Sequence, residues 1–549
     1  MSIRRLHQVG LLTLVVSLAT VAANAQSFRV QCPTSTITHP DITTTQLLNS
    51  SEPAYTGPTT QALGTKGYLV PTGNVNGAIK CQQISGGDGF ATMGDGTQTF
   101  MFSFGPLSGL ADIAAGKPGT EFPSVFNTWI GANTPAPGDP ATSDDPSGLG
   151  TSTGNPINLN GAGSFQYNGA IGQVPNSDNG GAMDGHVDPR QIMDVGVMNG
   201  NIPAPLMAID EDDEFFLTLT NVGMIMRPDL FEQHTVHFHG YPNASSIYDG
   251  VPDASVAINI GASFTYYYLA PDAGTYFWHC HITPPEHLQM GMVGQLYVRP
   301  RQNRVTAGNP LYASLQAQQT DLRTACNSAS DILCSNPLPA GGTTVNTATA
   351  ANTIGNGGTA GGYAYNDGDG STYYDVEYPL QIHGFDPNFH FVGMTFNPEG
   401  FADMKDKYFL LNGRSYPDTI QSGPLSTETS DGRHHFSQPL PSIITIPAGK
   451  KALLRISDLD VSEYQTLASL GIPMKVIGYN AKLLRDQAGN NLYYNTNSIT
   501  LAGGESLDVI LDATGYTAGQ VFYLYTPNLD HLANDAENFG GLMTEVHVN

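Results

Sequence analysis

Residue types that bind transition metals gather in two short segments of the chain, at positions 234–239 and 279–292. Imidazole nitrogens, thiolate sulfur and thioether sulfur are ligands that copper and other transition metals accept. Histidines that merely fill a core would not be concentrated in this way, so the pattern predicts a metal site. Its candidate ligands are His234, His237, His239, His279, Cys280, His281, His287 and Met292.

Four of the histidines are spaced to lie on one face of a sheet. Side chains two residues apart along a strand point to the same side. If both segments are strands, His237 shares a face with His239, and His279 shares a face with His281. We therefore expect a four-imidazole face, which suits copper.

The cysteine points away from its two histidine neighbours, toward the side that His234 can reach. A turn at Pro284-Pro285 is expected to bring His287 and Met292 back to the Cys280 thiolate. Two histidines, one thiolate and a distant thioether form the ligand set of a blue, type 1 copper site. Zinc is disfavoured, because structural zinc recruits paired cysteines or a fourth strong ligand, and methionine is a weak one.

The direct covalent link between the two sets of ligands predicts electron transfer. Cys280 is bonded to both His279 and His281 through short stretches of backbone. An electron accepted at a thiolate-bound copper could therefore pass to the four-imidazole face. We predict Cys280, His279 and His281 as the catalytic residues.

The other cysteines are candidates for disulfides. The chain has five cysteines, an odd number. Sequence proximity favours Cys32 with Cys81 and Cys326 with Cys334, among three possible pairings. Cys280 is then left as a free thiol, which agrees with a role as a ligand.

The first 25 residues are typical of an export signal, with Arg4 and Arg5 before an apolar run and Ala23-Asn24-Ala25 as a cleavage site. The apolar run is too short to span a membrane, and no later segment is long and apolar enough. We expect export to the periplasm or the extracellular space, where disulfides persist.

The formal net charge of -26 argues against binding to nucleic acid or anionic lipid, which would repel the protein. Part of this charge lies in the run Asp210–Glu214, which we interpret as a solvated turn before a strand. If the run lay near His234 or His287, it could instead bind a metal-ion substrate such as Mn(II) or Fe(II).

An all-β fold is favoured by the composition: only 13% of residues are charged, whereas there are 62 glycines and 37 prolines. We divide the chain into a signal peptide at 1–25, an irregular extension at 26–78, a first domain at 79–300, a linker at 301–370 and a second domain at 371–549. The first domain contains a Gly-rich insertion at about 131–190.

The two strand-rich halves show the same order of signals, which indicates two copies of one β-sandwich. In this alignment, the first histidine segment corresponds to Ile472, Lys475 and Ile477. The second corresponds to Leu524, Tyr525 and Thr526. We therefore expect the second copy to have lost its metal ligands.

At these motifs the chain resembles the multicopper oxidases, the laccase-like cupredoxin family. The resemblance rests on residues 234–240 (HTVHFHG), Asp249-Gly250, 273–275 (AGT), 279–282 (HCHI), His287 and Gly291-Met292. It implies two cupredoxin-like Greek-key β-sandwiches, with type 1 copper in the first.

The resemblance also implies roles for the ligands. His234, Cys280, His287 and Met292 would hold type 1 copper, and the four-imidazole face would be half of a type 2/type 3 copper cluster. Such a cluster reduces dioxygen to water with electrons from a small reducing substrate, phenolic or a metal ion. His287 lies seven residues after Cys280, where the family has five, and we interpret the difference as a small loop insertion.

Two alternatives stay open because the second half has no His-x-His pair. A neighbouring subunit, for example in a homotrimer, could complete the second copper site, in a laccase-like enzyme or in a copper nitrite reductase-like enzyme. Alternatively, only the type 1 site would function, in an electron carrier or copper-binding protein.

Overall fold

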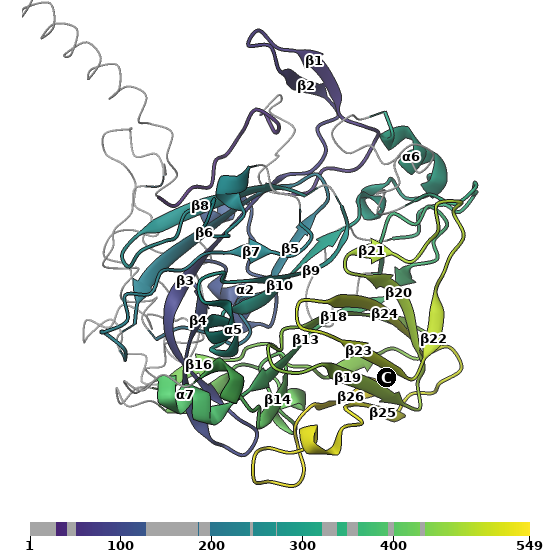
Figure 1. Ribbon diagram of the computed structural model, residues 1–549. Helices are drawn as coiled ribbons and strands as arrows, with labels where there is room; N and C mark the ends of the chain where they lie inside the picture. Colours follow the sequence, from purple (N-terminus) through teal and green to yellow (C-terminus); the bar gives the residue numbers. More distant parts are fainter. Residues whose placement is uncertain are drawn as a thin grey trace, which may run out of the picture.

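The computed structural model describes residues 29–40, 51–127, 185, 198–224, 226–241, 245–270, 272–320, 337–348, 361–393, 400–428 and 434–549. Strands dominate these segments (Figure 1), and the all-β prediction is confirmed. The predicted export signal, the insertion except Gly185, and Cys326 and Cys334 lie outside them. No helix in the described part of the chain combines the length and hydrophobicity that a membrane span requires.

The first half of the chain forms two four-stranded sheets that enclose one core. The first sheet has the order β4-β3-β6-β8 and the second the order β5-β10-β9-β7. The strands of the first sheet are β4 (Gln98–Pro106), β3 (Ile79–Thr92), β6 (Glu214–Gly223) and β8 (Ser263–Leu269). Those of the second are β5 (Met207–Asp210), β10 (Val293–Arg299), β9 (Gly274–His279) and β7 (His237–Phe238).

The alternation in β6 shows why this sequence is a strand of the sandwich. Phe215, Leu217 and Leu219 point into the core between the two sheets. Phe216 points the other way and packs with Cys32 and Cys81. Each buried aromatic or aliphatic side chain stabilises the fold by about 1.5–3 kcal/mol.

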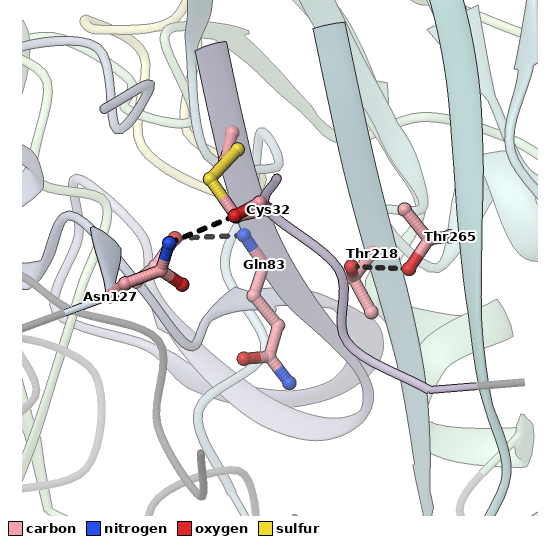
Figure 2. Close-up of a disulfide and its surroundings, with 7 residues drawn as sticks. Cys32, Gln83, Asn127, Thr218 and Thr265 are labelled. Carbon is pink, nitrogen blue, oxygen red and sulfur yellow. Dashed lines mark hydrogen bonds between the residues drawn. A yellow bond between two sulfur atoms is a disulfide. The ribbon is translucent and has the colours of Figure 1, made fainter. Parts of the chain in front are cut away.

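A disulfide fastens the N-terminal segment to the outer face of the first sheet. Cys32 is bonded to Cys81 on β3 (Figure 2), the pairing that sequence proximity favours. The Cys32 carbonyl accepts a hydrogen bond from Asn127 Nδ2 at 2.8 Å. The disulfide thus ties residues near position 30 to the strand that also borders the metal ligands.

The second half forms a larger sandwich of a seven-stranded and a five-stranded sheet, drawn in green and yellow in Figure 1. The seven-stranded sheet consists of β14 (Tyr408–Leu411), β13 (Val376–Phe385), β18 (Lys451–Asp458), β24 (Ser506–Asp512), β20 (Met474–Tyr479), β21 (Lys482–Leu483) and β22 (Tyr494–Thr496). The five-stranded sheet consists of β17 (Ile444–Ile446), β26 (Met543–Val548), β25 (Val521–Tyr525), β19 (Gln465–Leu470) and β23 (Ser498–Leu501). The domain boundaries at 79–300 and 371–549 stay predictions.

Smaller elements lie around the two sandwiches. There are three strand pairs: β1 (Thr60–Leu63) with β2 (Leu69–Gly73), β11 (Gly362–Tyr363) with β12 (Tyr373–Tyr374), and β15 (Leu425–Glu428) with β16 (His434–Ser437). The described helices are α2 (Leu110–Ala114), α3 (Pro123–Phe126), α5 (Pro284–Gln289), α6 (Leu311–Gln318) and α7 (Pro387–Gly393), with short 3-10 turns elsewhere. The extension at 26–78 therefore contains a hairpin, and the linker at 301–370 contains a helix.

The acidic run between β5 and β6 is buried, so its interpretation as a solvated turn is wrong. Asp210 to Glu214 are each at most 4% exposed. Arg301 donates to Asp212 at 2.8 Å, and Arg304 to the same carboxylate at 3.2 Å. These arginines lie about 90 positions away in sequence, which is why the run alone did not reveal its partners.

Candidate metal centre

The second sheet of the first sandwich positions both histidine segments. β7 and β9 are antiparallel neighbours, with His237 opposite His279 and Phe238 opposite Trp278. His234 lies before β7, and α5 follows β9 after Cys280. The two segments therefore meet at one end of the sheet.

His234, Cys280 and His287 come together on the core side of this sheet. One ligand atom from each lies within 4.8 Å of the other two, and all three side chains are fully buried. His287 Nδ1 is 3.2 Å from Cys280 Sγ, and the Thr235 backbone N–H points at the same sulfur at 3.4 Å. This is the juxtaposition that the alternation of side chains predicted.

The turn expected at Pro284-Pro285 is a short helix. Thr283 adopts a left-handed conformation, and the two prolines open α5. The helix holds His287 facing the sulfur, and the backbone of Met292 then donates to the His287 carbonyl at 2.8 Å. Met292 is fully buried in the same hydrophobic cluster as Cys280, and its carbonyl accepts from the Cys280 N–H at 3.0 Å. The lengthened loop thus leaves both residues beside the cysteine.

Burial and charge shift the pKa values of the two histidines of this group in opposite directions. Burial alone would lower the pKa of His287, but the charge of Cys280, the hydrogen bond to its sulfur and the nearby Glu232 carboxylate raise it to about 9. Burial, and then His287, lower the pKa of His234 well below its usual range. Neither ring nitrogen of His234 has a hydrogen-bond partner, although both are buried. A buried polar atom without a partner destabilises the fold, and a bound metal ion would give one of these two nitrogens a partner.

Glu232 is a site residue that the sequence analysis did not identify. One of its carboxylate oxygens lies 3.6 Å from His287 Nε2, on the side of the ring away from the cysteine. Carboxylates in this position orient a metal-bound imidazole and strengthen it as a ligand. A signal was present in the sequence, because Glu232 lies two residues before His234.

On the other side of β9, His237, His239, His279 and His281 gather as predicted. The His237 ring centroid lies 5.5 Å from those of His239 and His279, and 5.1 Å from that of His281. His239 Nε2 and His279 Nε2 are 3.0 Å apart. The four-imidazole face therefore exists within the described residues.

Backbone carbonyls fix the orientation of these rings. His237 Nδ1 donates to the Asp249 carbonyl at 2.7 Å, and His279 Nδ1 donates to the Cys280 carbonyl at 2.6 Å. Burial, and then His237, lower the pKa of His239 to about 4. Burial also lowers the pKa of His279 to about 3. Both rings are thus neutral at pH 7, the state in which an imidazole binds a metal ion.

A cavity of about 380 Å³ opens beside this face, between the two sandwiches. On the first sandwich it is lined by His239, His279 and the start of α5. The second sandwich contributes residues 460–464 and 502–504, including Asp460 and Glu463. Because these segments are far from the histidines in sequence, no sequence pattern indicated the contact.

The second sandwich contains a counterpart of the core-side site, but not at the positions that the sequence alignment gave. Strand pairing places Ala468 opposite Tyr525, as His237 is opposite His279. Counting from these pairs, Gln465 corresponds to His234 and Thr526 to Cys280. The prediction that the first histidine segment corresponds to Ile472–Ile477 is therefore wrong. The prediction that Cys280 corresponds to Tyr525 is wrong as well.

Backbone hydrogen bonds extend the correspondence to His287 and Met292. Leu542 donates to the His531 carbonyl at 3.0 Å, as Met292 does to His287. His531 Nε2 also lies 3.0 Å from the Glu463 carboxylate, as His287 Nε2 lies 3.6 Å from that of Glu232. His531 Nδ1 lies 3.0 Å from Gln465 Oε1, its hydrogen-bond partner. In the first sandwich the corresponding space holds Cys280, His234 and His287. One histidine and one acid are retained, whereas the thiolate and the second imidazole are absent.

A family model and several known proteins match part of this chain. The family model for multicopper oxidases matches residues 183–303. Laccase abr2 of Aspergillus fumigatus is 34% identical over 109 residues, which cover 20% of this chain and 17% of that protein. A copper-containing nitrite reductase of Rhizobium meliloti is also 34% identical over 109 residues, covering 19% of this chain and 26% of that protein.

Similarity to solved structures is broader but weaker. A blue copper oxidase from Nitrosomonas europaea aligns with 64% of this chain and 78% of its own, at 20% identity and a TM-score of 0.41. The chain aligns with less than a fifth of the length of the fungal laccase, so its similarity to that protein is local. Residues 183–303, which match the family model for multicopper oxidases, hold every predicted copper ligand.

Proposed function

We propose that this protein is an exported, copper-dependent oxidoreductase that oxidises a small substrate one electron at a time. Type 1 copper would be held by His234, Cys280, His287 and Met292. The observation that carries this proposal is the position of the Cys280 sulfur, buried with His234 and His287 while the neighbouring His279 lies on the opposite face. Copper bound to the thiolate would supply the one-electron redox chemistry.

Cys280 also links the two faces of the strand. Its backbone joins His279 and His281 directly, and its carbonyl accepts the 2.6 Å hydrogen bond from the His279 ring. Electrons would therefore have both a covalent and a hydrogen-bonded route to the four-imidazole face. We propose that this face holds further copper of the type 2/type 3 kind and that dioxygen is reduced there.

The reducing substrate would approach near His287 and Glu232. Glu232 is the exposed member of the pair, with 28% of its side chain accessible, whereas His287 is fully buried. A partly exposed carboxylate beside a redox centre favours a donor that carries a positive charge or a hydrogen-bonding hydroxyl. A metal ion and a phenol both fit, and the acids at 210–214 play no part in binding the donor because they are buried.

Nitrite is the competing oxidant, because a copper-containing nitrite reductase matches this chain with the same identity as a fungal laccase does, 34% over 109 residues. The cavity beside the four-imidazole face is lined by Asp460 and Glu463, and no Lys or Arg is among its described lining residues. Carboxylate walls repel an anion and leave a neutral molecule unaffected. This favours dioxygen over nitrite.

The experiment compares the wild-type protein with Cys280→Ser. We expect the wild type to absorb intensely in the visible range and to consume oxygen with a phenolic or metal-ion donor, and Cys280→Ser to lose both. Cys280→Ser that stays blue would contradict the copper site. A blue wild type that consumes no oxygen with any donor would favour the electron carrier, and one that consumes nitrite instead would favour the reductase.

A further inference from the structure

We infer that the second sandwich holds the ligand loop of the first in place, and that Gln289 is the positioning residue through which it acts. The ligand loop is the segment 281–292 between β9 and β10, which includes α5 and carries His287 and Met292. The inference rests on the proposed function and adds to it, because it gives the half of the chain that lacks the copper ligands a role at the copper site.

The side chain of Gln289 bonds to the second sandwich through both ends of its amide. Its Nε2 donates to Asp406 Oδ1 at 2.9 Å, and its Oε1 accepts from the backbone N–H of Asp386 at 3.0 Å. A backbone N–H can only donate, so the second contact fixes the orientation of the amide. Asp386 directly follows β13, and Asp406 lies just before β14, the antiparallel neighbour of β13. The Asp386 carboxylate also accepts from the Lys405 N–H at 2.7 Å, which holds the two partners together.

The backbone of the ligand loop is held by two histidines from the second half of the chain. His383 on β13 donates from Nε2 to the Leu288 carbonyl at 2.9 Å. The ring of His390 on α7 lies between two carbonyls, 2.9 Å from that of Gln289 and 2.7 Å from that of Phe100 on β4. Burial lowers the pKa of His390 to about 3, so the ring is neutral and donates to one of these carbonyls at a time. The end of α5 is therefore held through its backbone as well as through Gln289.

The hydrophobic core of the first sandwich continues across the same contact. Phe389 of α7 is buried and belongs to the cluster that also contains Cys280, Met290 and Met292. The ligand loop thus lies where the two sandwiches meet, with α5 between β4 and the strands of the second half (Figure 1).

His287 and Gln289 face different sides of α5. Successive residues of a helix are about 100° apart, so residues two positions apart point about 200° apart. His287 Nδ1 lies 3.2 Å from the Cys280 sulfur, whereas the Gln289 amide faces the second sandwich. Loss of the Gln289 bonds would therefore leave every candidate ligand in place in the sequence but would loosen the helix that carries His287. Because a ligand must be held within about 0.5 Å of its productive position, we expect weaker copper binding.

Gln295 provides a matched control. It is fully buried on β10, and its Nε2 donates to the Arg455 carbonyl at 3.0 Å and to Ser457 Oγ at 2.6 Å, both on β18. Like Gln289, it is a buried glutamine of the first sandwich that bonds to the second. Unlike Gln289, it lies on a strand outside the ligand loop.

The test compares Gln289→Leu with Gln295→Leu in the full-length protein, by copper titration, visible absorption and electron paramagnetic resonance. We expect Gln289→Leu to bind type 1 copper about tenfold to hundredfold more weakly and with a shifted spectrum, in the range found when the support of a ligand is removed. Gln295→Leu should keep the wild-type affinity and spectrum. Amide hydrogen exchange at 284–292, measured without copper, should be faster in Gln289→Leu and unchanged in Gln295→Leu.

Variants of Asp406 test the same hydrogen bond from the second sandwich, also if Gln289→Leu does not fold. Asp406→Ala removes the acceptor and should weaken copper binding as Gln289→Leu does. Asp406→Asn keeps an acceptor oxygen and should retain the wild-type spectrum. In the double variant the two losses should not add, because both remove one interaction.

Wild-type copper affinity, spectrum and hydrogen exchange in Gln289→Leu would overturn the inference and leave the proposed function intact. An equal change in Gln295→Leu would overturn it as well, because any weakening of the contact between the sandwiches would then suffice. A wild-type protein without blue absorption would contradict the proposed function, and the exchange at 284–292 would still decide whether Gln289 holds the loop.

Discussion

Gly86 on β3 sits against the ring of His234, and replacing it with alanine should disturb the copper site selectively. An added Cβ atom would lie 2.6 Å from His234 Cδ2. Ordinary van der Waals contact begins at 3.4 Å, so the ring would have to move by roughly 0.8 Å. Gly86 is not among the glycines with positive φ, so the effect comes from space rather than from backbone strain.

This displacement is large for a metal ligand. Functional constellations must be held within about 0.5 Å of their productive geometry. We expect copper at this site to bind about tenfold to hundredfold more weakly, in the range found when the support of a ligand is removed. Overpacking should also lower the free energy of unfolding by about 1–3 kcal/mol.

The assay is a copper titration followed by visible absorption, alongside urea unfolding of the metal-free protein. Gly119→Ala serves as control, because its Cβ atom would also lie 2.6 Å from a neighbour, Ile113 Cδ1, which is not a candidate ligand. We expect weakened, spectrally shifted copper binding in Gly86→Ala and wild-type binding in Gly119→Ala. Gly86→Ala with the copper affinity and spectrum of the wild type would refute the placement of His234 at the metal.

Three further predictions concern other residues. Glu232→Gln should weaken type 1 copper binding about tenfold or more by loosening His287, and an unchanged copper affinity and spectrum would argue against its role as a positioning residue. Burial, and then Asp460, raise the pKa of Asp406 well above its usual range, so the folded protein keeps a proton that the unfolded chain releases above about pH 4. The free energy of unfolding therefore falls as the pH rises from about 4 toward the pKa of Asp406 in the folded protein, by up to about 1.4 kcal/mol per pH unit. Urea unfolding of Asp406→Asn should show a smaller fall over the same pH range. Equal slopes in the two proteins would contradict the assignment of this proton to Asp406. Finally, Gln465→His, Thr526→Cys and Leu542→Met together, in a Cys280→Ser background, should restore blue absorption at the second sandwich, and a folded but colourless variant would contradict the correspondence with the first.

The local part of the site could be predicted from the sequence. Alternation along a strand is a property of the backbone, so it separated Cys280 from His279 and His281 without knowledge of the fold. The prolines after Cys280 also indicated that the chain turns back toward it, although α5 replaces a simple turn.

What the sequence could not provide depends on contacts between distant segments. The alignment placed the counterpart of the first histidine segment on β20, because both contain a Gly-Tyr pair and alternation cannot tell which strand is its neighbour in the sheet. The pairing of β19 with β25 identifies the correct segment. The burial of Asp212 and the approach of Gly504 to His239 likewise depend on residues far away in the chain.

The central claim is that Cys280, His234 and His287 bind one type 1 copper ion. The most direct measurement is a titration of the metal-free, full-length protein with copper, followed by visible absorption and electron paramagnetic resonance. We predict an intense blue absorption with the intensity of one type 1 copper ion per chain, which is absent from Cys280→Ser. A wild-type protein that binds copper without blue absorption, or that stays blue without the cysteine, would contradict the account.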